Sequence, residues 1–379
     1  MSEAGKFDAG VVGAGILGLA HAYRLALKGL KVVVFERRSR PEGASIRNNG
    51  MIWPIGQASG KKYALALRSR NLWCELLKES GIWQEETGSL HLAYHQDEAQ
   101  VLQEFASSLA SSGVEKELLT SAEVAKRSQA AKQKGLLAGL WSPAEICVDP
   151  REVLSKLPIW LTQKFGIQFV YETTVTGYVQ PVLAGGGKSW RIPRLFVCCG
   201  DSYEALFPRV FEGEGILRCK SQMMRTTPYP ADWKLGPMLA GGLALTDSKS
   251  FEPCLSLPTL KKRFSDTAPL LQKFGVNATV SQNGLGELII GQSHEYGAEI
   301  EPFDKHEIDM LLIDYLIGFL EVPSIRIAAK WSRITTLHPS RDYSVVNPAP
   351  GATLIANLGD SDMTLALGLA EEVVQERLG

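Results

Sequence analysis

The feature that most constrains the fold is a glycine-spaced turn near the N-terminus, Gly13-Ala14-Gly15-Ile16-Leu17-Gly18. An apolar run over 7–12 precedes this turn, and a stretch with helical spacing over 19–28 follows it. A second apolar run over 31–35, rich in β-branched residues, then ends in Glu36. Strand, glycine turn, helix, strand and acid in this order are typical of a dinucleotide-binding βαβ unit.

Each residue type in this unit has a physical role. Gly13 permits the tight turn, Gly15 lets the backbone approach a pyrophosphate, and Gly18 lets the helix pack close to the strand. The helix start supplies unpaired N–H groups and a partial positive charge for the phosphates. Glu36 is placed to accept hydrogen bonds from the adenosine ribose hydroxyls. A glycine-rich turn in an ordinary βαβ unit is the alternative, but the agreement of strand, helix and acid favours the dinucleotide.

Length and composition bound the remaining possibilities. A chain of 379 residues is suited to roughly two domains, and its hydrophobic content of 45% allows a sizeable core. The net charge of −1 gives no electrostatic case for binding nucleic acid or an acidic membrane surface. The six cysteines show no CxxC spacing, so we expect free thiols and no metal site. Without a signal peptide or an apolar stretch long enough for a bilayer, a cytoplasmic location is expected.

The rest of the chain predicts alternating helices and strands. Helices are expected over 61–80, 97–111 and 121–127, with a strand over 87–94. Asp149 followed by Pro150 predicts a helix start that leads to about Phe165 and then a strand over 167–171. The buried run 195–199 ends in Gly200, which fits a strand at the cofactor crevice. Residues 215–328 predict a largely antiparallel sheet with one long helix over 304–320, and a strand over 353–357 and a final helix close the chain.

The sequence resembles the FAD-dependent amine and amino-acid oxidase superfamily, which includes D-amino acid oxidase, glycine oxidase and monomeric sarcosine oxidase. The resemblance covers nearly the whole chain in order. It rests on the opening motif over 7–18, a Ser-x-Arg-Asn-x-Gly segment at 45–50, the glycine-ended strand 196–200 and the glycine-containing turn and helix at 357–368. Within the superfamily, the chain is similar to a bacterial branch linked to aminophosphonate breakdown.

The resemblance implies an α/β fold with two domains. A Rossmann-like FAD-binding domain is expected in three segments, 1–84, 146–214 and 331–379. The segments 85–145 and 215–330 are expected to form an α+β substrate domain on a largely antiparallel sheet. FAD is expected to bind without a covalent bond, because the segment after Trp331 offers no cysteine.

The resemblance also implies a reaction. A small amine that bears an acid group (an amino acid, an N-methyl amino acid or an aminophosphonate) gives up hydride to the flavin, and the imine hydrolyses to an aldehyde or oxo acid. Because the flavin carries this chemistry, no catalytic side chain is predicted. The strand 287–291 lacks the lysine that promotes reaction with oxygen in the sarcosine oxidase branch, so the electron acceptor is oxygen or another molecule.

The expected cofactor contacts lie in the glycine turn, the loop after Glu36, the second glycine-ended strand and the C-terminal turn. The loop over 37–54 is dense in hydrogen-bonding groups, so it is better explained as wrapping the cofactor than as a solvated connection. The full set is Gly13, Ala14, Gly15, Ile16, Leu17, Gly18, Glu36, Arg37, Ser45, Arg47, Asn48, Asn49, Gly50, Met51, Val175, Cys199, Gly200, Gly359, Asp360, Ser361, Asp362, Met363 and Thr364.

Four residues are predicted to contact the substrate: Arg333, His294, Tyr296 and Trp53. The resemblance places Arg333 where relatives hold an arginine that binds the substrate's carboxylate. A guanidinium gives two parallel charge-assisted hydrogen bonds to a carboxylate or phosphonate, and so fixes the pose of a small molecule. The alternative for Arg333 is a structural salt bridge to an acid such as Asp342.

Two aspartates in the C-terminal turn depart from the family pattern, which is usually glycine-rich there. Asp362 is expected to cap the final helix. A carboxylate facing the flavin pyrimidine, however, opposes the negative charge of reduced flavin. Two further readings therefore stay open: an NAD-dependent dehydrogenase, which shares the opening motif, and an FAD-binding protein without turnover.

Overall fold

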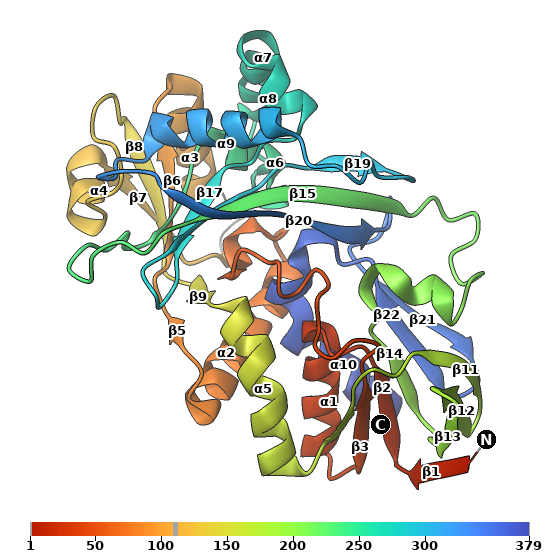
Figure 1. Cartoon of the computed structure of the whole chain (residues 1–379). Helices are drawn as coiled ribbons and strands as arrows, with labels where there is room; N and C mark the ends of the chain where they lie inside the picture. Colours follow the sequence, from red (N-terminus) through yellow and green to blue (C-terminus); the bar gives the residue numbers. More distant parts are fainter. Residues whose placement is uncertain (1, 109–112, 379) are drawn as a thin grey trace.

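Two large sheets, one above the other in Figure 1, carry most of the chain. The computed structural model describes residues 2–108 and 113–378. The lower sheet has six strands in the order β10 (Gln168–Val170), β3 (Val32–Phe35), β2 (Ala9–Val12), β14 (Leu195–Val197), β22 (Ala352–Ala356) and β21 (Ser344–Ala349). All neighbouring strands are parallel except β21, which runs antiparallel to β22. The strands therefore present their carboxyl ends at one edge, where an open α/β sheet binds its ligand.

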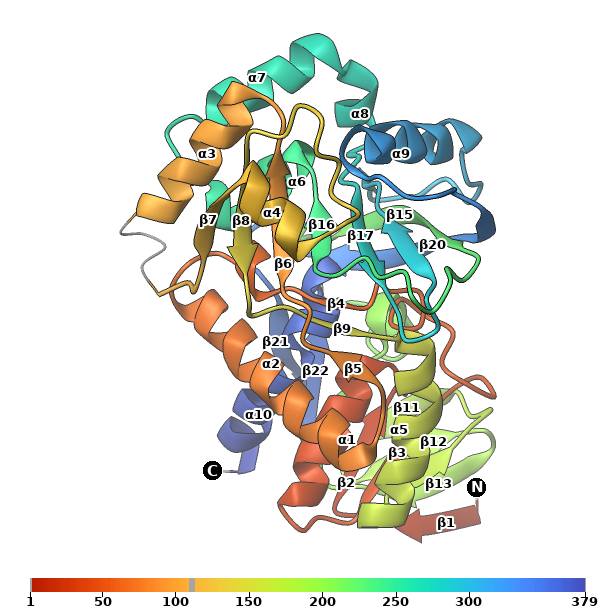
Figure 2. The same cartoon turned by 90° about the vertical axis from the view of Figure 1, so that its left-hand side faces the viewer.

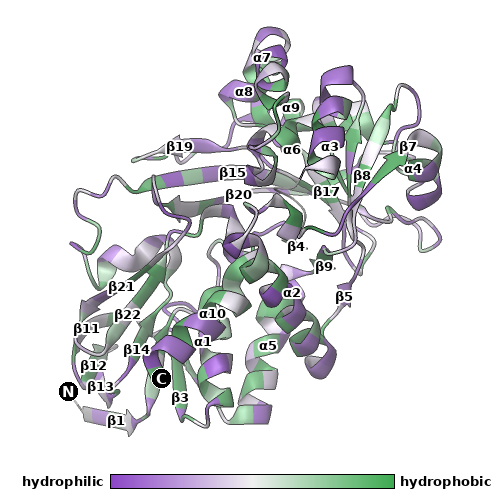
Figure 3. Cartoon of the chain, turned by 180° about the vertical axis from the view of Figure 1, so that it is seen from behind, coloured by the Kyte–Doolittle hydropathy of each residue, from purple (hydrophilic) through white to green (hydrophobic). Residues whose placement is uncertain are grey.

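Both faces of this sheet are covered, so its strands are apolar on both sides. One hydrophobic cluster joins alternate strand residues such as Val11 and Val34 to α1 (Ile16–Leu27), α2 (Lys61–Ser80), α5 (Pro150–Phe165) and α10 (Asp362–Leu378). The opposite side chains, such as Val33 and Val197, pack on a second sheet in the order β1 (Ser2–Lys6), β13 (Lys188–Arg191), β12 (Val182–Gly185) and β11 (Val175–Val179). In Figure 3 the strands of the six-stranded sheet are mostly green, as expected for this double burial.

The larger sheet has nine strands. Their order is β19 (Glu295–Gly297), β15 (Leu217–Thr226), β18 (Leu288–Gly291), β17 (Thr279–Gln282), β16 (Met238–Ala240), β6 (Ser89–Ala93), β8 (Ala138–Ser142) and β7 (Glu117–Thr120), with β20 (Ile327–Leu337) paired to β15. These strands pair antiparallel except for β16 with β6, which are parallel. Around it lie α3 (Gln96–Ser107), α4 (Ser121–Arg127), α6 (Gly242–Asp247), α7 (Leu257–Thr267), α8 (Pro269–Lys273) and α9 (His306–Phe319).

Short connections join the two large sheets. A three-stranded sheet, β4 (Met51–Ile52), β9 (Ile146–Val148) and β5 (Gln84–Glu85), lies between them in Figure 2. The β15–β20 ribbon passes over the edge of the six-stranded sheet (Figure 1). Two 3-10 turns, η3 (Gly200–Ala205) and η5 (Gly359–Ser361), follow β14 and β22 at that edge. The carboxyl ends of the parallel strands therefore face the underside of the ribbon.

The predicted fold class, a Rossmann-like domain with a second domain on a largely antiparallel sheet, is confirmed. Asp149 caps α5 by accepting a hydrogen bond from the Arg151 N–H, and the helix ends at Gly166 in the left-handed conformation. The domain boundaries stay a prediction.

Two expectations were incomplete. The substrate region holds α6, α7 and α8 besides the predicted long helix, and β20 was not predicted as a strand. Burial alternates along it only at the start, over 327–330, and the buried charged residue Arg333 belongs to the ion pairs described below. The predicted helix over 97–111 is α3, and residues 109–111 of that prediction lie outside the described residues.

Candidate functional site

The glycine turn forms the floor of a cavity at the carboxyl edge of the six-stranded sheet. Gly13 adopts φ +99°, and a Cβ there would lie 2.5 Å from the backbone oxygen of Cys198. A Cβ on Gly18 would lie 1.8 Å from the Gly13 oxygen, so helix α1 and strand β2 pack closer than any side chain permits. Gly15 is different: its φ is −68°, and the added Cβ would approach only Ser45 Oγ, at 3.1 Å. The first and third glycines are thus required by the fold, whereas a side chain at the second would meet only Ser45 of the following loop.

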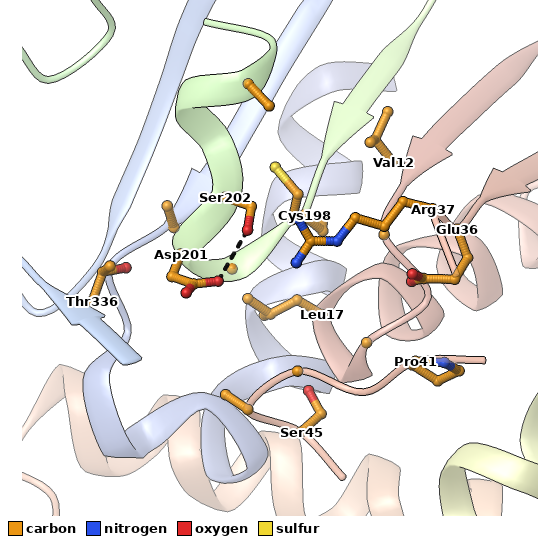
Figure 4. A pocket seen from close by; sticks show the side chains of 18 of the residues that line it. Val12, Leu17, Glu36, Arg37, Pro41, Ser45, Cys198, Asp201, Ser202 and Thr336 are labelled. Atoms are coloured by element: carbon orange, nitrogen blue, oxygen red, sulfur yellow. Dashed lines mark hydrogen bonds between the residues drawn. The ribbon is translucent and has the colours of Figure 1, made fainter. Parts of the chain in front are cut away.

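Glu36 is held at the side of this cavity with most of its surface buried. One carboxylate oxygen accepts the N–H of Ala14 at 3.1 Å, and the other accepts the N–H of Arg38 at 3.1 Å. These bonds orient the carboxylate, and each oxygen retains a further lone pair for a ligand hydroxyl. Figure 4 shows Glu36 and Arg37 at one side of the cavity, with Asp201 and Ser202 from η3 on another.

The loop after β3 closes over the start of α1. Ser45 Oγ accepts the N–H of Ile16 at 3.1 Å, and this N–H is the first of the helix. Farther along the loop, Asn48 donates to Asp362 at 3.1 Å and accepts the N–H of Gly50 at 2.9 Å. Gly50 adopts φ +74°, with its Cα packed against the Val148 oxygen. The loop is therefore fixed to both the first and the last helix of the sheet.

A second cavity, of about 270 Å³, adjoins the first. Four residues line both cavities: Thr335, Asn357, Leu358 and Gly359. The C-terminal turn therefore forms the boundary that the two cavities share. This volume lies near the lower end of the range for ligand pockets and suits a small molecule.

Arg333 lies in the wall of the second cavity with 1% of its surface exposed. Strand β20 places it opposite Ser221 of β15. Its Nη2 donates to Asp360 and, at 3.3 Å, to the side-chain oxygen of Gln292. Nη1 is 3.6 Å from Asp362. Within the described part of the chain, Nε and Nη1 are buried and have no hydrogen-bond partner.

His294 completes this charged group from behind the cavity wall. Its Nε2 lies 2.5 Å from Asp360 Oδ2, and its Nδ1 lies 3.1 Å from the backbone oxygen of Gly275. Because both ring nitrogens face oxygen acceptors, the geometry favours the doubly protonated imidazolium. Burial alone would lower the pKa of His294, but the charges of Asp360 and Asp247 outweigh it and raise the pKa to about 9.

The two aspartates of the turn respond in opposite directions. Burial pushes the pKa of Asp360 upward, but Arg333 and His294 outweigh it and hold that pKa well below its usual range. Burial raises the pKa of Asp362, and Arg333 offsets only part of this effect. Arg333 and protonated His294 therefore balance the two carboxylates at the end of the cavity nearest the turn.

A model of the FAD dependent oxidoreductase family, DAO, matches residues 8–376. The chain belongs to this family. Among solved structures, it is similar to L-proline dehydrogenase from P. horikoshii (TM-score 0.77, 18% identity, covering 100% of this chain and 95% of that one). It is also similar to glycine oxidase from Geobacillus kaustophilus (TM-score 0.77, 19% identity, covering 98% and 95%). These likenesses show the shared fold.

Among curated proteins, the oxidoreductase is 40% identical over 76 residues to monomeric sarcosine oxidase from Bacillus sp. (strain B-0618). The matched stretch covers 20% of this chain and 20% of that protein. A 48-residue stretch is 52% identical to protoporphyrinogen oxidase 2 of Arabidopsis thaliana and covers 12% of this chain and 9% of that protein. The chain thus spans about a fifth or less of the curated relatives it matches. The family assignment replaces the NAD-dependent alternative with FAD as cofactor.

The residues present fit FAD. Gly15, at the N-terminal end of α1, and the oriented Glu36 carboxylate line one cavity and suit a phosphate group and a ribose. No cluster of metal-binding side chains occurs among residues 2–108 and 113–378. In the same ranges, no helix is long and apolar enough to cross a membrane.

Most of the predicted site residues line one of the two cavities. The first cavity is lined by Gly13, Gly15, Leu17, Glu36, Arg37, Ser45, Val175, Cys199, Gly200, Gly359 and Asp362. The second is lined by Asn49, Met51, Trp53, Tyr296, Arg333, Gly359, Asp360, Ser361 and Thr364. Eight predicted residues line neither: Ala14, Ile16, Gly18, Arg47, Asn48, Gly50, His294 and Met363. Several of these support the walls, as Asn48 and His294 do through Asp362 and Asp360.

The salt bridge from Arg333 to Asp342 that the sequence left open is not formed. Asp342 pairs instead with Lys62 and Lys249, and Arg333 pairs with Asp360. The sequence interpretation missed several lining residues of the second cavity: Lys62, Cys219, Lys249, Gln292, Arg341 and Asp342. They come from α2, β15, η4 (Lys249–Phe251) and loops. No local pattern marks them, because only the tertiary fold brings them together.

Proposed function

We propose that the oxidoreductase oxidises the C–N bond of a small amine that bears an acid group: an amino acid, an N-methyl amino acid or an aminophosphonate. The observation that carries this proposal is Arg333, a buried guanidinium in the wall of the second cavity with two unpaired donors. The names of the similar structures, glycine oxidase and L-proline dehydrogenase, agree with a small amino-acid-type substrate.

We place FAD in the first cavity, with its reactive end at the C-terminal turn that both cavities share. Gly13, Gly15 and the start of α1 hold the pyrophosphate, and Glu36 holds the ribose. The loop 45–51 then follows the flavin towards the second cavity. When bound, FAD accepts hydride from the amine's α-carbon, and the resulting imine hydrolyses to an aldehyde or oxo acid.

The side chains of the second cavity orient the substrate. Arg333 offers its unpaired Nε or Nη1 donor to an acid oxygen, while Asp360 holds Nη2. His294 supports Asp360, and Tyr296 and Trp53 form walls. Fixing the acid group directs the α-hydrogen at the cofactor, and this orientation is the main catalytic contribution of the protein. No side chain is required as a strong base if the amine binds in its neutral form.

An anaerobic reduction screen tests the proposal. Purified holoenzyme is mixed without oxygen with small amino acids, N-methyl amino acids and aminophosphonates, and the flavin absorbance is followed. We expect at least one class to bleach the flavin. Readmission of air then reports whether oxygen is an electron acceptor. If no compound bleaches the flavin, the proposal is wrong and the alternative, an FAD-binding protein without turnover, replaces it.

Arg333→Lys tests the anchor separately from the cofactor. Lysine keeps the positive charge but cannot present two parallel donors. Loss of one charge-assisted pair costs about 2–3 kcal/mol, so apparent substrate binding should weaken roughly 30- to 150-fold while FAD stays bound. Arg326→Lys, at an exposed arginine just before β20, is the matched control. Unchanged kcat/KM in Arg333→Lys on the best substrate would falsify the anchor role.

A further inference from the structure

Three cations gather in the second cavity away from Arg333. Lys62 and Lys249 both contact the same carboxylate oxygen of Asp342, at 2.8 and 3.0 Å. Arg341 Nη1 lies 3.3 Å from Glu214. Lys62, Lys249 and Arg341 all line the cavity. We call these three residues the basic rim.

His338 also contacts Glu214, with Nε2 at 3.0 Å from its carboxylate. Its other ring nitrogen, Nδ1, accepts the N–H of Ser340 at 3.1 Å and therefore carries no proton. His338 is thus a neutral donor and adds no charge. The basic rim has three positive charges against the two carboxylates, Asp342 and Glu214, which leaves one positive charge unbalanced.

The other end of the cavity has no such surplus. Arg333 and His294 are matched there by Asp360 and Asp362, and Asp247 adds a further carboxylate to the wall. An anion in this cavity therefore finds its uncompensated positive charge at the basic rim. At the other end, Arg333 offers the anion unpaired hydrogen-bond donors, but its positive charge is already balanced by the aspartates.

The two ends are well separated along β20. A strand rises about 3.3 Å per residue, so the Cα atoms of Arg333 and Leu337 are roughly 13 Å apart. Arg341 and Asp342 lie four and five residues beyond Leu337, and both line the cavity with Lys62 and Lys249. Lys62 is the most buried of the three, with 12% of its side chain exposed, so solvent screens its charge least.

We propose that Lys62, Lys249 and Arg341 form a subsite for a distal acid group of the substrate, a carboxylate or phosphonate at the end away from the oxidised C–N bond. This inference rests on the proposed amine oxidation and narrows its substrate class. A distal anion supplies the third negative charge at the basic rim. Together with Asp342 and Glu214 it balances the three cations. A neutral group of the same shape gains nothing from that surplus charge, so the rim selects acids over their amides.

Isosteric substrate pairs test the subsite during turnover. Aspartate against asparagine, and glutamate against glutamine, differ only in the charge of the distal group, and both enantiomers are compared. We expect at least a tenfold preference in kcat/KM for the acid. The double variant Lys249→Gln/Arg341→Gln should remove that preference, because both residues are about half exposed and their loss leaves the fold intact. Lys262→Gln, at an exposed lysine on α7, is the control.

A binding measurement without turnover separates this inference from the proposed function. Succinate, glutarate and adipate are titrated into holoenzyme against their monoamides, and the shift of the flavin absorption gives the dissociation constants. The diacid should bind at least tenfold tighter than its monoamide. Lys249→Gln/Arg341→Gln should abolish this difference, and Asp342→Asn, which frees two lysines, should increase it. Replacing one carboxylate by a phosphonate shows which acid the rim prefers.

The outcomes are distinct. Equal binding of diacids and monoamides, or equal losses for both in the double variant, would overturn the subsite whatever the amine screen shows. A charge preference that follows Asp342→Asn and the double variant supports the subsite. It does so even if no amine reduces the flavin, in which case the proposed oxidation alone is wrong.

Discussion

The two cavities of this oxidoreductase are built by different means. The first is formed mainly by backbone: a glycine turn, a helix start and the ends of β2, β3 and β14. The second is formed by side chains from many separate segments, with a buried arginine between two aspartates at one end and the basic rim at the other. Backbone geometry of this kind is encoded in a few consecutive residues. Charged side chains from distant segments are positioned only by the complete fold.

The comparison predicts that single substitutions affect the two cavities differently. In the first cavity, a substitution acts by filling space that the cofactor needs. In the second, it acts by leaving a charge without its partner. Substitutions in each cavity test this difference.

Gly15→Val should prevent FAD binding and leave the fold intact. The glycine has an ordinary φ, and an added Cβ would meet the Ser45 side chain at 3.1 Å and no backbone atom, so Ser45 must give way by a few tenths of an ångström while the backbone stays in place. The side chain instead occupies the approach to the helix start, where we place the pyrophosphate. We expect FAD affinity to fall at least ~100-fold, which is about 3 kcal/mol. The measurement is the flavin-to-protein absorbance ratio after purification.

Gly177→Val is the matched control, because Gly177 lies on β11 with no atom within 4 Å of an added Cβ. It should retain the wild-type flavin content. A Gly15→Val protein that purifies with full flavin would show that the pyrophosphate lies elsewhere.

Arg333→Met should destabilise the protein through the second cavity. Removing a buried cation leaves Asp360 and Asp362 with one fewer partner, and breaking a buried pair in this way costs about 3–5 kcal/mol. Adding Asp360→Asn should recover part of the loss, since it removes one of the stranded carboxylates. Urea unfolding at saturating FAD measures the free energy of unfolding for each variant.

Lys249→Met provides the comparison within the same cavity. Its ion pair with Asp342 is about half exposed, so the expected cost is below ~1 kcal/mol. If Arg333→Met and Lys249→Met lowered the free energy of unfolding by similar amounts, the ion pairs near the C-terminal turn would not be the more strongly stabilising ones in this cavity.

The difference between the cavities also explains how far the sequence could be interpreted. The order of strand, glycine turn, helix and acid lies within 36 residues, and each part predicts its neighbour. The antiparallel strand β21 was not predicted, but the parallel strands of the six-stranded sheet followed from this order and from the later apolar runs. The β20 strand did not, because Arg333 is a charged residue in a buried position whose partner, Asp360, lies on a different element 27 residues later.

The basic rim was equally hidden. Lys62 lies in the first turn of α2, whose sequence is that of an ordinary amphipathic helix. Lys249 lies in a short 3-10 turn, and Arg341 lies in a loop. Each is unremarkable in its own segment. Their shared cavity depends on how the larger sheet packs against α2 and the C-terminal turn, and no spacing within the sequence reports that packing.

His294 should give the second cavity a pH dependence that the first lacks. Its folded pKa of about 9 lies above the ordinary 6.5, so its protonation stabilises the fold fully below pH 6.5 and this stability is lost as pH rises through 9. The shift corresponds to about 3 kcal/mol. Urea unfolding at several pH values measures it, with FAD held at saturation.

His294→Gln is the matched variant, because glutamine still donates to Asp360 but does not titrate. The stability difference between wild type and His294→Gln should shrink between pH 6.5 and 10. A difference that stays constant over this range would mean that His294 is neutral in the folded protein.

Ser45→Ala should weaken FAD binding slightly through the first cavity. Ser45 Oγ accepts the Ile16 N–H at 3.1 Å, which ties the loop 45–51 to the start of α1. Alanine removes this bond and frees the loop that we place along the flavin. The loss of one hydrogen bond costs about 1 kcal/mol, so FAD affinity should fall roughly fivefold. Flavin fluorescence titration measures the affinity, and amide hydrogen exchange measures protection of the loop.

Ser202→Ala tests whether the loss of FAD affinity comes from freeing the loop 45–51, and not from removing any hydroxyl group in the cavity. Ser202 also lines the first cavity, but its hydroxyl donates only to the neighbouring Asp201, at 3.1 Å. Its removal should change FAD affinity less than Ser45→Ala does. In the wild type, FAD should slow amide exchange over 45–51, and Ser45→Ala should reduce that slowing while Ser202→Ala preserves it. Equal exchange of this loop with and without FAD would place the flavin away from the loop. The part of the first cavity that binds FAD would then extend no farther than the pyrophosphate.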